Sequence, residues 1–88
     1  MDKYLWALLD ALRNYQLEPS LYDIMDLVVL SIQPAIDSGD AELQEIVDTL
    51  DYSLIDLEEN IITQVEMDNI ITDQFEKLLR YAERVEQN

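Results

Sequence analysis

The spacing of apolar side chains between residues 43 and 61 constrains the fold more than any other feature of this sequence. These side chains recur at alternating intervals of four and three residues, which is the period of one face of an α-helix. The seam consists of Leu43, Val47, Leu50, Leu54, Leu57 and Ile61. It predicts a helix of up to about six turns that reaches about Thr63, either continuous or broken at Asp51-Tyr52-Ser53.

The N-terminal part of the chain predicts two more helices. The first covers about residues 2–15, where Leu and Tyr recur every three or four residues. The second starts at Glu18-Pro19, because proline is tolerated in the first turn of a helix. Pro34 is expected to stop or kink this helix near Ser31, since proline disfavours helical geometry in the residue before it. The side chains expected to face the core are Leu21, Ile24, Met25, Val28, Val29 and Ile32.

The only glycine of the chain lies in Asp37-Ser38-Gly39-Asp40, which is the clearest turn signal. Together with Glu42, this segment places three acids around a glycine, so a calcium loop has to be considered. An EF-hand loop requires ligands at positions 1, 3, 5 and 12 and glycine at position 6, and the segment does not have that register. We therefore expect a turn followed by a helix that Asp40 caps.

The C-terminal segment predicts a last helix over about residues 68–86, after a loop near residues 64–67. Asp68 or Thr72 is the expected N-cap. The side chains expected to face the core are Ile71, Phe75, Leu78, Ala82 and Val85. Four helices joined by short connections predict an all-α fold, a small antiparallel four-helix bundle that forms a single domain over residues 1–88.

The charge of the chain is strongly negative and unevenly placed. Twenty acids and 5 bases give a net charge of −15, and every charged residue from 14 to 76 is an acid. Affinity for nucleic-acid phosphates comes mainly from lysine and arginine, so this surface disfavours direct binding of nucleic acid. The same surface can attract a basic protein, including a protein that itself binds nucleic acid.

The residue types in the chain exclude several kinds of active site. The sequence has no cysteine and no histidine, which removes thiol nucleophiles, imidazole bases and the usual zinc ligands. A di-iron carboxylate bundle needs Glu-x-x-His pairs and is excluded for the same reason. Carboxylate pairs are abundant, but no sequence feature indicates the hydrophobic pocket that would raise the pKa of one of them. We expect no enzymatic activity, no cofactor and no metal.

Targeting signals are not evident in the sequence. The start Met-Asp-Lys-Tyr-Leu-Trp lacks the charged leader and the long apolar run of a signal peptide. The most apolar stretch, residues 27–32, is far shorter than the roughly 20 residues that a membrane span needs. Because small secreted proteins are commonly stabilised by disulfides, a chain without cysteine is expected to be cytoplasmic.

A row of acids beside the apolar seam is the candidate binding site. Acids one helical turn apart lie roughly 5–6 Å from each other, which is comparable to the phosphate spacing along a nucleic-acid strand. Tyr52 lies among them, and an aromatic ring surrounded by carboxylates is typical of an interface hot spot. A solvated face with a boundary tyrosine is the alternative, but it does not explain the missing bases over residues 14–76. The predicted partner-binding residues are Glu45, Asp48, Asp51, Tyr52, Asp56 and Glu59.

Two segments carry a family resemblance. Residues Ser38-Gly39-Asp40-Ala41-Glu42-Leu43, followed by a helical stretch, and the closing segment Phe75 to Ala82 resemble Maf-type immunity proteins of bacterial competition systems. The resemblance implies a cytoplasmic protein that blocks a nuclease toxin. Phage-encoded nucleic-acid mimics, including anti-CRISPR proteins, share this size and charge and are equally compatible. A helical adaptor that dimerises or holds a partner helix through an apolar face is a further alternative, in which the acids provide solubility.

Overall fold

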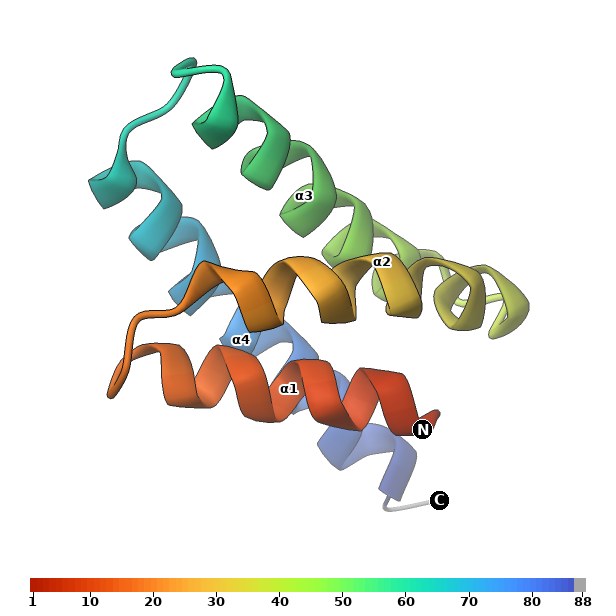
Figure 1. The fold of residues 1–88 in the computed structure, drawn as a ribbon. Coiled ribbons are helices and arrows are strands. Elements are labelled where there is room, and N and C mark those ends of the chain that lie inside the picture. The colour runs from red at the N-terminus through yellow and green to blue at the C-terminus, as the bar shows by residue number, and fades with distance from the viewer. Residues whose placement is uncertain (87–88) are drawn as a thin grey trace.

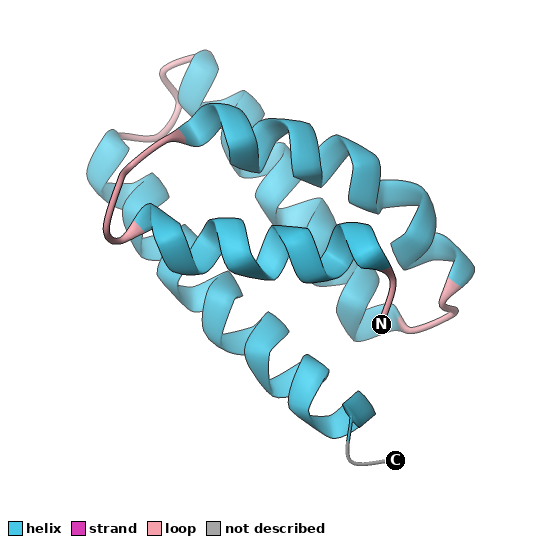
Figure 2. Ribbon diagram, turned by 60° about the horizontal axis from the view of Figure 1, so that its bottom comes forward, coloured by secondary structure: helices cyan, strands magenta, loops and turns pink. Residues whose placement is uncertain are grey.

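The computed structural model describes residues 1–86, which form four helices and no strand (Figure 1). The helices are α1 (Lys3–Tyr15), α2 (Leu21–Asp37), α3 (Ala41–Glu58) and α4 (Gln64–Glu86). Each helix packs against its neighbours in the chain, and α4 also packs against α1, which closes the bundle (Figure 2). The predicted all-α, antiparallel four-helix bundle is therefore confirmed.

The core is formed by aliphatic side chains from all four helices. In α1 the predicted stripe is confirmed, because Leu5, Leu8, Leu9 and Leu12 are almost completely buried. The other helices contribute a buried centre that consists of Ile24, Val28, Ala35, Leu43, Ile46, Val47, Leu50, Leu54, Met67, Ile71, Leu78 and Ala82. Partly buried side chains, among them Trp6 and Phe75, cover this centre.

Helix α3 follows the predicted seam but ends earlier than expected. Leu43, Val47, Leu50 and Leu54 are buried, and the helix is continuous through residues 51–53. The Asp40 side chain accepts a hydrogen bond from the Leu43 amide at 3.1 Å, which confirms the predicted N-cap.

The predicted end of α3 near Thr63 is wrong, because the helix stops at Glu58. Asn60 adopts a positive φ of 61° just past the helix. The Ile61 amide donates to the Asp56 carbonyl at 2.8 Å, and the Asn60 amide donates to the Leu57 carbonyl at 3.1 Å. This pair of bonds is the Schellman motif, which satisfies the last carbonyls and ends a helix.

Helix α4 starts at Gln64, so the loop predicted over residues 64–67 and the N-cap predicted at Asp68 or Thr72 are wrong. The Glu66 amide donates to Thr63 Oγ1 at 3.1 Å, and the Thr63 amide donates to Glu66 Oε1 at 3.3 Å. These reciprocal bonds form a capping box, which satisfies amides that an uncapped helix start would leave unpaired.

Helix α2 differs most from the prediction, in both its ends and its buried face. It starts at Leu21, after Pro19, and continues past Pro34 to Asp37. Pro34 has no amide hydrogen, so the carbonyl of residue 30 lacks its usual helical partner, and the helix nevertheless continues for three residues beyond Pro34.

The buried face of α2 is rotated towards α1. Ser31 and Ala35 are buried, whereas Met25 and Val29, which were expected in the core, are exposed. Ser31 Oγ donates to the Tyr4 carbonyl of α1 at 3.4 Å. Small side chains at positions 31 and 35 let the two helices approach closely, and this contact turns the larger apolar residues of α2 outwards.

Candidate protein-binding surface

The six partner-binding residues predicted from the sequence all lie on α3 or at its C-terminal end, but they do not form one face. Glu45, Asp48, Tyr52 and Glu59 are exposed, and Tyr52 exposes 65% of its surface. Asp51 and Asp56 are half-buried. Five residues of helix separate these two acids by about 140° around the axis, so they lie on opposite flanks of the exposed four.

The neighbouring helices identify the two flanks. Asp56 lies on the side of α3 that also carries Glu42, whose carboxylate accepts from Arg84 Nη2 of α4 at 2.6 Å. Asp51 lies on the side of Glu58, which lines a groove together with Tyr22 of α2. Asp51 thus borders α2 and Asp56 borders α4. We call the outward group of Glu45, Asp48, Tyr52 and Glu59 the acidic row.

Sequence reasoning missed an apolar member of this face. Ile55 is exposed, follows Tyr52 by three residues and precedes Glu59 by four, so it lies on the same outward face of α3 as the acidic row. Its position off the Leu43 to Leu57 seam was the available signal. The face therefore combines exposed carboxylates with two side chains that expose apolar area, Tyr52 and Ile55.

The acidic row has no neutralising base. Helices α2 and α3 contain no lysine or arginine, because all 5 bases lie in α1 and α4. Of the bases, Arg13 pairs with Asp10, Lys77 with Asp73, and Arg84 with Glu42. None of the ion pairs within residues 1–86 involves a member of the acidic row, so its negative potential is uncompensated.

A second surface feature lies on α2, where several large apolar side chains face solvent. Tyr22, Met25, Val29 and Ile36 lie within about 60° of each other around the axis at 3.6 residues per turn. Tyr22 exposes 81% of its surface and Val29 exposes 65%. We call these four residues the α2 stripe. The sequence reading missed it because Met25 and Val29 also have a spacing that suits the core.

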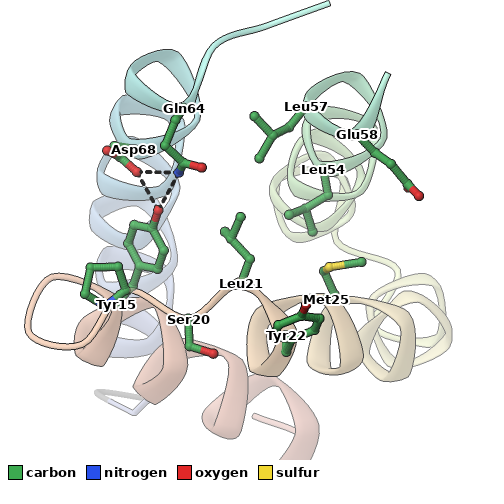
Figure 3. A pocket seen from close by; sticks show the side chains of 11 residues that line it. Tyr15, Ser20, Leu21, Tyr22, Met25, Leu54, Leu57, Glu58, Gln64 and Asp68 are labelled. Carbon is green, nitrogen blue, oxygen red and sulfur yellow. Dashed lines mark hydrogen bonds between the residues drawn. The ribbon is translucent and has the colours of Figure 1, made fainter. Parts of the chain in front are cut away.

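A groove of about 580 Å³ extends from the α2 stripe towards α3 and α4 (Figure 3). Tyr22 and Met25 belong both to the stripe and to the wall of the groove. Side chains of Leu21, Leu54 and Leu57 point into the space between α2 and α3. The wall is therefore mainly apolar, with Glu58 at its α3 edge.

A hydrogen-bonded cluster closes one end of the groove. The Tyr15 hydroxyl donates to Asp68 Oδ1 at 2.5 Å, and Gln64 Nε2 donates to Tyr15 Oη at 2.8 Å and to Asp68 at 2.9 Å. Burial and the hydrogen bond to the Asp68 carboxylate raise the pKa of Tyr15 to about 12. The hydroxyl therefore stays protonated at neutral pH and serves to join α1 to α4.

Within residues 1–86, no group of three acidic side chains is arranged to hold a metal ion. No helix in this range combines the length and the hydrophobicity needed to cross a membrane. Comparison with protein-family models, with curated proteins and with solved structures found no match.

Proposed function

We propose that this protein is a non-enzymatic inhibitor, active in the cytoplasm, that binds the basic surface of a nucleic-acid-acting protein. The observation that carries the proposal is the acidic row, in which exposed carboxylates surround Tyr52 and no base lies on α2 or α3. A nuclease toxin of a bacterial competition system is the partner that the resemblance to Maf-type immunity proteins implies.

Inhibition would follow from occupation of the partner's nucleic-acid groove. Glu45 and Asp48 are one helical turn apart, and such acids are separated by roughly 5–6 Å, similar to consecutive phosphates of a strand. Lysines and arginines that bind phosphates would bind these carboxylates instead. Tyr52 and Ile55 would supply buried apolar area at the centre of the contact, where hot-spot residues concentrate.

The same surface fits a phage-encoded nucleic-acid mimic or an anti-CRISPR inhibitor. In that case the partner would be a CRISPR effector or another host enzyme rather than a toxin. A helical adaptor or dimerisation module is the alternative of another class, and the exposed α2 stripe is the observation that favours it.

Affinity capture from the source cells tests the proposal with a pair of charge-reversed variants. The first variant, Asp48→Lys with Glu59→Lys, changes two exposed acids of the acidic row. The control, Glu76→Lys with Glu83→Lys, makes the same change in net charge on the exposed surface of α4. Wild type and control are expected to capture the same basic nucleic-acid-acting protein, and the first variant should lose it, because like charges repel at the contact.

Two outcomes of this capture experiment would contradict the proposal. If both charge-reversed variants capture that protein as well as wild type does, the acidic row is not the binding site. If the wild-type protein captures only itself or an acidic scaffold, the adaptor alternative replaces the inhibitor.

A further inference from the structure

We propose that the α2 stripe and its groove bind an amphipathic, basic helix of the partner protein. Apolar side chains of that helix would enter the groove, and its lysines and arginines would meet acids on either side. This inference rests on the proposed function, since it names the part of a basic partner that the molecule binds. It adds a second surface, on α2, to the acidic row of α3.

The apolar surface is long and continuous. The α2 stripe extends from Tyr22 to Ile36, a distance of about 21 Å along the helix axis at about 1.5 Å per residue. At Tyr22 and Met25 it continues into the groove, where Leu54 and Leu57 of α3 form the opposite wall (Figure 3). A surface of this length accommodates about four turns of a second helix, which is the usual arrangement of a helix bound in a groove.

Acids border this apolar surface on both sides. On the α3 side lie Asp51, which is half-buried, and Glu58, which is exposed. On the outer side lies Asp26, which is exposed and is one turn from both Tyr22 and Val29. Since α2 and α3 contain no base, nothing in either helix neutralises these borders. An apolar strip between two negative borders matches a helix with an apolar face between basic residues.

The same charges argue against the other occupants of such a groove. A second copy of this chain would bring identical acids face to face, at a net charge of −15 per molecule. Anionic lipid surfaces attract basic segments and would repel this one. An extended peptide normally adds to the edge of a sheet, and no strand occurs within residues 1–86. A basic helix is the occupant that fits both the shape and the charge.

A peptide-binding experiment tests this inference directly. The probe is a fluorescent synthetic peptide of about 18 residues, made of leucine and lysine, with all leucines on one helical face. A permuted peptide of the same composition, with its leucines spread around the helix, isolates the contribution of charge. Fluorescence anisotropy should show that the full-length protein binds the amphipathic peptide at least about tenfold more tightly than the permuted one, because only the first can bury its leucines in the groove.

Two valine variants assign the binding to α2. Val29 and Val65 expose 65% and 68% of their surfaces, but only Val29 belongs to the α2 stripe. We expect Val29→Gln to weaken binding of the amphipathic peptide by about fivefold, because it removes apolar contact area. Val65→Gln at the start of α4 should leave the affinity unchanged. Circular dichroism checks that both variants keep the helical content of the wild type.

The results separate a failure of this inference from a failure of the proposed function. Equal, salt-sensitive binding of the two peptides would overturn the inference and leave the acidic inhibitor intact, because charge alone would then be recognised. Equal loss in the two valine variants would overturn it as well. A wild-type dimer that Val29→Gln converts to a monomer would assign the stripe to a second copy. Absence of binding to either peptide at low salt would overturn this inference alone, because the proposed function is tested separately by capture of the partner through the acidic row.

Discussion

Tyr15 illustrates how a single side chain can hold two distant segments together. Its hydroxyl and Gln64 both hydrogen-bond Asp68, so the C-terminal end of α1 is fixed to the first two turns of α4. Sequence periodicity placed Tyr15 on the buried face of the first helix, and it is buried. Its partners could not be predicted, because the sequence pattern favours a loop near residues 64–67, which includes Gln64. Contacts between residues far apart in the chain depend on how helices are positioned, which local spacing does not determine.

The raised pKa of Tyr15 predicts a loss of stability at high pH. An unfolded tyrosine titrates near 10, whereas burial and Asp68 raise the pKa of Tyr15 to about 12 in the folded protein. Its stabilising contribution is complete below pH 10 and is lost as the pH rises towards 12, because the unfolded state then releases the proton more readily. Urea unfolding measured across this range should show a steeper loss in wild type than in Tyr15→Phe. Parallel curves for the two proteins would show that the hydroxyl has no such role.

At the acidic row, residue-level prediction succeeded only in part. The Leu43 to Leu54 seam determines which side of α3 faces the core, so Glu45, Asp48 and Tyr52 could be assigned to the outside. The half-buried positions of Asp51 and Asp56 depend on where α2 and α4 pack against α3. Charge alone does not identify Ile55, which the sequence places on the same face by its spacing from Tyr52 and Glu59.

At the level of helices, apolar spacing predicted that the four helices are present better than it predicted the residues at which they begin and end. The capping signal of α4, Thr63-x-x-Glu66, was present in the sequence, and so was Asn60 as a residue that accepts positive φ. The rotation of α2 was harder to predict. Ile24 and Val28 suit two overlapping faces, one completed by Met25 and Val29 and the other by Ser31 and Ala35. Close packing against α1 selects the second face, which leaves the α2 stripe exposed.

The orientation of α2 leads to a stability prediction. Ser31 is completely buried against α1, so Ser31→Leu should force the two helices apart and lower the free energy of unfolding by about 1–3 kcal/mol. Val29→Leu, a similar enlargement at an exposed position of the same helix, should change it by less than about 0.5 kcal/mol. Chemical denaturation of both variants provides the comparison. Equal effects would mean that the face carrying Ser31 is not the one packed against α1.

At the level of the whole molecule, the bundle separates its charges by helix. All 5 bases lie in α1 and α4, and three of them form ion pairs within residues 1–86. All charged residues of α2 and α3 are acids. The α2 stripe lies on α2, the acidic row lies on the outer face of α3, and the groove lies between the two helices. One side of the bundle thus presents an uncompensated negative surface with apolar contacts. This arrangement favours binding of a basic protein over a function limited to solubility.

The rate at which the captured partner associates, measured against salt concentration, tests the central proposal most directly. Between about 0.01 M and 0.15 M salt the Debye length falls from about 30 Å to about 8 Å, so association steered by the acidic row should slow steeply in wild type. The Glu76→Lys, Glu83→Lys control should keep most of that rate and its salt dependence. The Asp48→Lys, Glu59→Lys variant should associate slowly at low salt and depend little on salt. A wild-type rate that does not change with salt, or equal rates for the two variants, would contradict binding through the acidic row.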